Sequence, residues 1–217
     1  AIAASLVLLS GEIDLSIGAS VVISPALAIH LINFLNIKMY GKAIMRGGYV
    51  TGNWWLIILL TIVIATLIGV LNAIIVVKGK VPAFITTIGM QFTITGVGFL
   101  VTKGTPLFLT RVKGADVIGN YRVLEYIPLC FFVFAILAAA FVFLNNNTRF
   151  GMRLYSTGGN TRAATLCGVS PAFWKMLRFV LRGFLPGIPG VIFLSKLPAI
   201  DSTPHARYSM TSRALAV

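Results

Sequence analysis

The chain has 217 residues, 58% of them hydrophobic and 11% charged, and its mean hydropathy is +0.94. Soluble domains carry about 25% charged residues, so this composition excludes an ordinary water-soluble fold and requires a bilayer to cover the apolar surface. The formal net charge of +13 falls mostly on links between apolar runs, which favours membrane-lipid headgroups as partners and argues against nucleic acid.

Apolar runs alternate with polar links along the chain and predict four to six membrane segments. The clearest run, 54–77, opens on Trp54-Trp55, which suit the headgroup layer. At ~1.5 Å per residue it crosses a ~30 Å core with some tilt. Pro25 predicts a kink in the second run unless neighbours satisfy the freed carbonyl. The runs are 1–9, 17–35, 54–77, 81–102, 126–144 and 176–199, and the links are 36–53, 78–80, 103–125, 145–175 and 200–213.

The run 81–102 differs from the others because it is rich in glycine and threonine and contains a glutamine. It is too polar for a lipid-facing helix, so we expect a buried helix, whole or broken, that lines a path. Within the spans, Asn72, Thr87 and Gln91 could face such a path or make hydrogen bonds between helices. Phe84 could stack on a ligand or simply pack.

Both ends of the chain are expected to be incomplete. The first residues already lie in an apolar run without the basic flank of a signal peptide, and Arg213–Val217 reads as the start of a further apolar element. The expected fold class is all-α, a polytopic membrane helical bundle, with residues 1–217 forming one transmembrane domain.

The segment Gly11–Gly18 places Glu12 and Asp14 inside an apolar stretch, where a charge is expensive and usually functional. A carboxylate there costs several kcal/mol unless it is paired, neutralised or hydrated. One interpretation of Asp14 is a polar lining of a substrate path. The other is a helix cap, because Asp14 and Ser16 can accept hydrogen bonds from the N–H groups that begin the following helix.

Within the link 145–175 the sequence predicts a short helix over 161–167. Asn160 is a favoured N-cap residue, Gly168 is a favoured residue just past a helix end, and Pro171 prevents continuation. Gly158-Gly159 would give the preceding turn conformational freedom. Because so short a helix is unstable alone in water, it is either a docking helix for another subunit or an ordinary connection.

The sequence shows no catalytic, phosphate-binding or metal-binding motif. No nucleophile–base pair, phosphate-binding loop or metal-ligand spacing is visible, so we expect no catalytic residues, no metal ligands and no cofactor on this chain. Cys130 and Cys167 have no partner at ligand spacing and are interpreted as packing residues. His30, alone on an apolar run, is interpreted in the same way.

Three blocks of the sequence, in order and spacing, resemble the permease subunits of bacterial ABC importers for monosaccharides, the ribose, xylose and galactose group. The family usually has an acidic residue where this chain has Arg162, and its later span lacks an equivalent of Arg182. The blocks are Gly11-Glu12-Ile13-Asp14-Leu15-Ser16-Ile17-Gly18; Gly69-Val70-Leu71-Asn72-Ala73 with Lys80-Val81-Pro82-Ala83-Phe84-Ile85-Thr86-Thr87-Ile88-Gly89; and Thr148-Arg149-Phe150-Gly151 with Leu154-Tyr155, Gly158-Gly159-Asn160, Ala163-Ala164 and Gly168-Val169.

The resemblance implies a helical bundle of the ABC importer permease type in the bacterial inner membrane, with 145–175 as a cytoplasmic coupling loop. It implies three protein partners: an ABC ATPase that binds ATP and Mg²⁺, a second permease, identical or paralogous, and an extracytoplasmic sugar-binding protein. The expected residues of the translocation path are Asp14, Asn72, Phe84, Thr87 and Gln91, and those of ATPase coupling are Gly158, Gly159, Asn160, Ala163, Ala164 and Gly168.

The function that follows is ATP-driven import of a monosaccharide by alternating access. If 145–175 is cytoplasmic, alternation places 78–80 on the same side and 36–53, 103–125 and 200–213 outside. The basic residues do not support one orientation over the other. Two alternatives remain: an ion-coupled carrier or channel without an ATPase, and a membrane enzyme acting on lipid-linked substrates.

Overall fold

A computed structural model describes residues 14–40, 45–46, 49–50, 53–104, 107–108, 121–123, 127–196 and 199–200. The expectations for residues 1–9, for Gly11 and Glu12, and for the tail after residue 200 lie outside the described residues. The helices are α2 (Ser16–Tyr40), α3 (Trp54–Val77), α4 (Ala83–Thr102), α6 (Leu129–Asn147), α7 (Arg149–Gly159), α8 (Thr161–Leu166) and α9 (Pro171–Lys196).

The all-α prediction is confirmed. Within the described part of the chain, five helices are long and apolar enough to cross a membrane: α2 up to Lys38, α3, α4, α6 and α9. Among the described residues, the strands are two-residue pairings between the long helices and after α9. They are β1 (Met45–Arg46), β2 (Tyr49–Val50), β3 (Leu107–Phe108), β4 (Arg122–Val123), β5 (Ile127–Pro128) and β6 (Ala199–Ile200).

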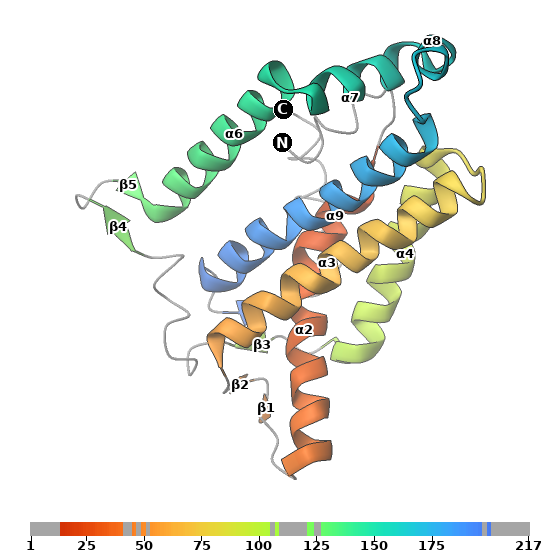
Figure 1. Cartoon of the computed structure of the whole chain (residues 1–217). Helices are drawn as coiled ribbons and strands as arrows, with labels where there is room; N and C mark the ends of the chain where they lie inside the picture. Colours follow the sequence, from red (N-terminus) through yellow and green to blue (C-terminus); the bar gives the residue numbers. More distant parts are fainter. Residues whose placement is uncertain are drawn as a thin grey trace.

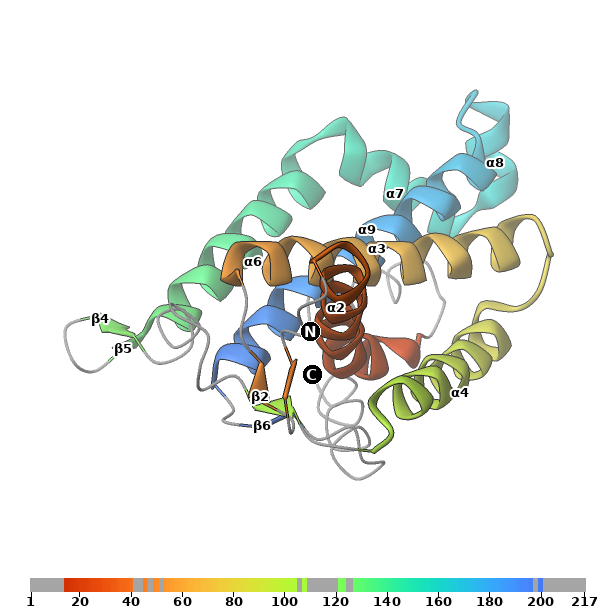
Figure 2. The same cartoon turned by 90° about the horizontal axis from the view of Figure 1, so that it is seen from below.

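Helix α2 is the centre of the bundle and packs against α3, α4 and α9 (Figures 1 and 2). Its inward residues are small or β-branched, such as Ala19, Val22 and Ile29, and they are fully buried. The helix continues through Pro25. The carbonyl of Val21, which Pro25 cannot bond, faces Gly190 of α9, so the neighbouring helix covers the defect.

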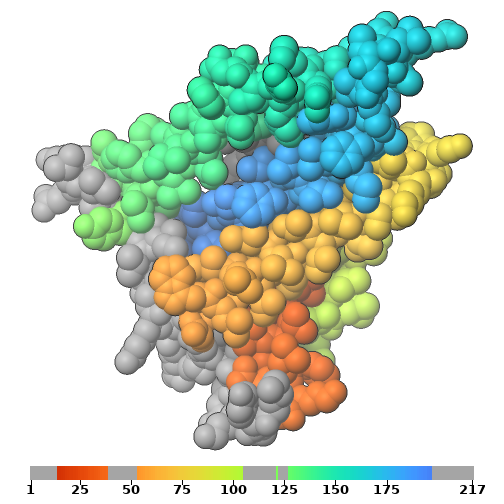
Figure 3. Space-filling view, in the orientation of Figure 1, coloured from red at the N-terminus to blue at the C-terminus, as the bar shows by residue number. Residues whose placement is uncertain are grey.

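Helices α3 and α9 cross at closest approach where two glycines face each other. A Cβ added at Gly69 would lie 2.6 Å from the Gly183 Cα, and one added at Gly183 would lie 2.6 Å from the Gly69 Cα. Only a residue without a side chain fits such a contact between backbones. The crossing holds α9 as a band between α3 and the α6–α7 pair (Figure 3).

Two details of the predicted spans were wrong. Of the two possibilities left open for α4, a whole helix is the one found. Only 22% of its apolar window is buried within the chain, so α4 is not the buried helix that we expected. Threonine hydroxyls of α4 donate hydrogen bonds to backbone carbonyls in the preceding turn. Thr93 Oγ1, for example, donates to the Gly89 carbonyl at 2.8 Å. Also, α2 extends to Tyr40, into the stretch that we expected to be a link.

The links gather at two opposite ends of the bundle. At one end β2 pairs with β3, and β3 pairs with β6, so the links after α2, α4 and α9 lie together. At the other end a shared groove joins the α3–α4 link to α7, α8 and the start of α9. The alternation predicted from the sequence therefore holds for these links.

Candidate functional site

A buried polar cluster lies where α2 begins. The Ser16 backbone N–H donates to Asp14 Oδ1 at 2.8 Å, and the Ser16 hydroxyl donates to the same oxygen at 3.2 Å. Asp14 therefore caps the helix, and its negative charge lies at the positive end of the helix dipole. The cap interpretation of Asp14 fits this geometry.

The countercharge comes from the far end of the sequence. Arg182, in the middle of α9, forms an ion pair with Asp14, and both side chains are at most 2% exposed. Arg182 Nη2 also donates to Ser16 Oγ at 2.6 Å. Because a lone buried charge is strongly unfavourable, this pairing explains how an aspartate and an arginine are tolerated at this depth.

Two further helices supply hydrogen bonds to the same cluster. Asn72 of α3, fully buried, donates from Nδ2 to Ser16 Oγ at 3.1 Å. Thr87 of α4 accepts from the backbone N–H of Leu15 at 3.4 Å. The Ser16 hydroxyl thus donates once and accepts twice, which is its full capacity. The cluster ties α2, α3, α4 and α9 together at one point.

The structure brings together three of the five residues predicted for the path: Asp14, Asn72 and Thr87. The side chains of the other two lie apart from this cluster, although the Phe84 backbone carbonyl accepts from the Thr87 hydroxyl at 3.2 Å. Phe84 is 49% exposed on α4, and Gln91, one turn beyond Thr87, is half-buried. The five residues therefore divide into a hydrogen-bonded group in the interior and a group on the open side of α4.

Arg182 is the cluster residue that sequence reasoning missed. It was read as a departure from the family pattern in an otherwise apolar run. A usable signal was present, because an arginine in the middle of a span needs a counter-ion. The chain has five acidic residues, so Asp14, just before a predicted span, was one of few possible partners.

The second candidate site is the short helix α8. Asn160 Oδ1 accepts from the Ala163 N–H at 3.0 Å and so caps its start. At its end, Gly168 has a φ of +76°. The N–H groups of Gly168 and Val169 donate to the carbonyls of Thr165 and Ala164, each at 3.0 Å, which completes a Schellman motif. The predicted caps are therefore correct.

Helix α8 projects away from the bundle (Figure 1). Ala164 is buried, whereas Ala163 and the other residues of the helix are exposed, and Leu166 is 88% exposed. Outside the membrane spans, an exposed leucine on a capped helix is available to a partner. The six residues predicted for coupling thus lie on or beside this helix.

The turn expected before α8 is instead a helix. Gly158 and Gly159 form the last turn of α7, which the sequence did not predict. Helix α7 buries Gly151, Leu154 and Thr157 on one side, a spacing of three that makes it amphipathic. It lies across the end of the bundle, packed on α6 and α9 (Figure 1).

The sequence was compared with known proteins. The family model described as "Branched-chain amino acid transport system / permease component" matches residues 1–216. The chain belongs to this family. It is a multi-pass protein of the bacterial inner membrane, in agreement with its five candidate spans.

Several curated proteins are similar along much of the chain. Ribose import permease protein RbsC of Haemophilus influenzae is 28% identical, over 100% of this chain and 63% of that protein. Galactose/methyl galactoside import permease protein MglC of Salmonella typhimurium is 30% identical, over 75% and 50%. L-arabinose ABC transporter permease protein AraH of Azospirillum brasilense is 25% identical, over 90% and 52%. The chain therefore spans less than two thirds of the relatives it matches. No solved structure matches it.

Proposed function

We propose that the chain is the membrane permease subunit of an ATP-driven importer for a monosaccharide. It would work by alternating access and would contribute no catalysis of its own, with ATP and Mg²⁺ bound by a separate ATPase subunit. The support for a sugar is that relatives named as ribose, galactose and arabinose permeases are similar to it.

The observation that carries the coupling proposal is the exposed surface of α8. A helix of six residues gains little from its own hydrogen bonds, yet this one is capped at both ends and holds Leu166 in the open. Burying a leucine contributes about 1.5–3 kcal/mol. We infer that the ATPase subunit covers Leu166 and that the α8 end of the bundle is cytoplasmic.

The open side of α4 is our proposed solute path. Phe84, Gln91 and Thr95 are spaced by seven and four residues, so they share one face of the helix. An aromatic ring with an amide and a hydroxyl suits a sugar, which has both C–H faces and hydroxyl groups. Asp14, Asn72 and Thr87 would hold α2 and α4 in position beside this path rather than contact the solute.

The remaining partners follow from the same arrangement. A second permease, identical or paralogous, would pack against α4 and close the path. Only 22% of the apolar window of α4 is buried within this chain, so most of the helix surface is left for a partner to cover. An extracytoplasmic sugar-binding protein would deliver solute to the opposite end, where β1, β2, β3 and β6 lie.

Uptake in reconstituted vesicles tests this function. The full protein, purified with the subunits that accompany it, should take up labelled monosaccharide only when ATP and Mg²⁺ are supplied on the α8 side. Uptake driven by an ion gradient without ATP would favour the carrier alternative and contradict the proposal.

Gly168→Pro tests the coupling step within the same system. Proline cannot adopt the positive φ at this position and has no N–H for Thr165, so the end of α8 should be lost. Membrane insertion should persist, while stimulation of the ATPase should disappear. The control is Gly96→Ala, where an added Cβ meets nothing within 4 Å. Normal stimulation in Gly168→Pro would count against docking through α8.

A further inference from the structure

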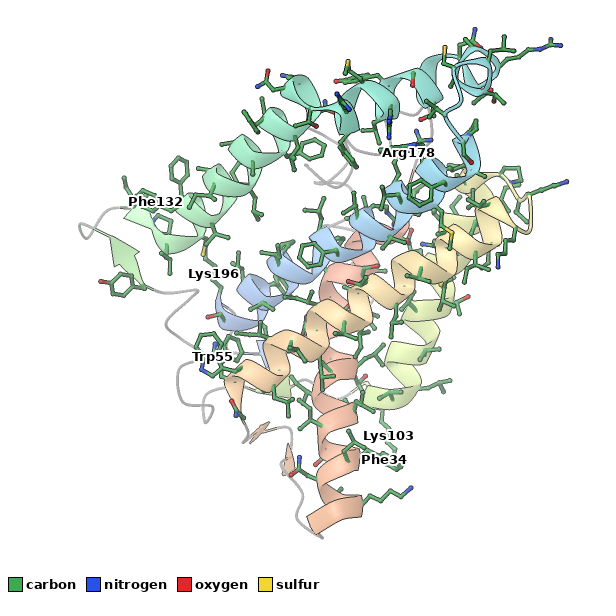
Figure 4. The ribbon with its side chains drawn as sticks, viewed as in Figure 1. Phe34, Trp55, Lys103, Phe132, Arg178 and Lys196 are labelled. Atoms are coloured by element: carbon green, nitrogen blue, oxygen red, sulfur yellow. The ribbon has the colours of Figure 1, made fainter. Side chains whose placement is uncertain are left out.

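A groove of about 470 Å³ opens at the α8 end of the bundle. It is separate from the buried cluster around Asp14, and it borders the second candidate site, since Gly158 and Thr161 are among its lining residues. It lies between the α3–α4 link, the junction of α7 with α8, and the first turns of α9. Its walls come from segments that are far apart in the sequence. Figure 4 shows Arg178, one of the lining residues, on the stretch of α9 that faces α7.

The groove is cationic. Lys80, Lys175 and Arg178 line it, and Arg178 is only 4% exposed. None of the described lining residues is acidic. The concentration of positive charge therefore favours an anionic ligand.

The hydroxyls of Thr157 and Thr161 also line the groove. Thr157 Oγ1 donates to the carbonyls of Arg153 and Leu154 at 2.8 and 3.0 Å. Its donor is therefore engaged along α7. The positive charge for an anionic ligand comes from Lys80, Lys175 and Arg178.

The other half of the lining is apolar. Val76 and Val77 end the α3 span, and Val81 and Pro82 lead into α4. The groove thus lies where the α3 span ends and α4 begins, and it combines apolar walls with cationic side chains. A carboxylate of a protein partner would need the cations alone, whereas a phospholipid would use both halves.

Aromatic side chains lie beside the groove in the sequence, since Trp174 directly precedes Lys175. The rings of Phe150 and Trp174 lie 5.4 Å apart, and Phe173 meets Trp174 edge-on at 5.9 Å. Arg153 lies over the Trp174 ring at 5.9 Å. Tryptophan with basic residues is typical of the headgroup region.

We propose that this groove binds the headgroup of an anionic phospholipid, with Lys80, Lys175 and Arg178 around the phosphate and the valine–proline wall against the start of the acyl chains. Basic pockets between spans on the cytoplasmic side are suited to such headgroups. The proposal does not depend on which solute the protein carries.

Native mass spectrometry of the full protein in detergent, titrated with phosphatidylglycerol or phosphatidylcholine, gives the affinity for each lipid. Phosphatidylglycerol should bind more tightly than phosphatidylcholine. Lys80→Gln and Lys175→Gln should each raise its Kd about fivefold, and the two together about 25-fold. Circular dichroism and the melting temperature in phosphatidylcholine check folding, and the single variants carry the test if the double variant does not fold.

Lys103→Gln is the matched control. Lys103 lies at the opposite end of α4 (Figure 4) and, like Lys80, has a positive φ, 51° against 54°. Lys103→Gln therefore removes one positive charge from a residue with the same left-handed backbone conformation, at a position away from the groove. Its Kd for phosphatidylglycerol should equal that of the wild type.

Three results would overturn the proposal. One is equal affinity for the two lipids. Another is displacement of phosphatidylglycerol by glycerol 3-phosphate at the same concentration as by the lipid itself, which would assign the site to a free phosphate. The last is wild-type lipid affinity in Lys80→Gln and Lys175→Gln together with loss of the co-purified ATPase, which would assign the surface to the protein partner.

Discussion

At the scale of single residues, the ion pair between Asp14 and Arg182 sets the energetics of the interior. Both charged side chains are almost completely buried. Each has lost its contact with water on folding and is stabilised by the opposite charge instead. Ser16 binds both, and Asn72 binds Ser16. Removing one charge leaves the other uncompensated, whereas removing both leaves a smaller polar group that can still cap α2.

Arg182→Met should therefore destabilise the protein by about 3–5 kcal/mol. Asp14→Asn combined with Arg182→Met should recover most of this loss, because asparagine keeps the cap and no charge remains. Unfolding in detergent, followed by circular dichroism, measures the difference between the single and double variants.

Lys196→Met is the control for this pair, since it removes an exposed charge from the end of the same helix. Its effect should lie within about 0.5 kcal/mol of zero. If Arg182→Met is as stable as this control, the pair does not support the fold. If the double variant is as unstable as Arg182→Met, charge compensation is the wrong explanation.

The sequence was sufficient for some of these residues and insufficient for others. Asp14, Asn72 and Thr87 stood out because each is polar within or beside an apolar run. Their joining through Ser16 was not predictable, because it depends on how α9 packs on α2 and α3. Arg182 was misread for the same reason: its partner lies 168 residues earlier in the sequence.

At the scale of elements, local chemistry specifies α8 better than it specifies the long helices. The caps of α8 depend on Asn160 and Gly168, whose preferences act within a few residues. Helix α7 escaped prediction because Gly158-Gly159 reads as a turn, although both glycines are helical here. The packing of Leu154 and Thr157 against the bundle outweighs the low helix propensity of the two glycines.

The crossing of α3 with α9 gives a test at this scale. Gly69→Ala should destabilise the bundle by about 1–3 kcal/mol, because the added methyl group would collide with the backbone at Gly183. Thermal unfolding in detergent measures this, with Gly96→Ala as the control of equal chemistry in open space. Equal melting temperatures for the two variants would mean that the helices cross farther apart.

At the scale of the whole molecule, the two ends of the bundle differ in kind. One end joins the links after α2, α4 and α9 through short strand pairings. The other presents α7, the exposed α8 and a cationic groove. This polarity suits a protein that receives a solute at one end and is moved by a partner at the other, and it makes orientation the central question.

Cys167, exposed at the end of α8, provides the most direct measurement. In a Cys130→Ser background, a membrane-impermeant maleimide should label Cys167 in inside-out vesicles and not in right-side-out vesicles. Bound ATPase subunit should reduce the labelling rate. Labelling of Cys167 from the outside, or a rate that the ATPase subunit leaves unchanged, would contradict the proposal that α8 is the cytoplasmic docking helix.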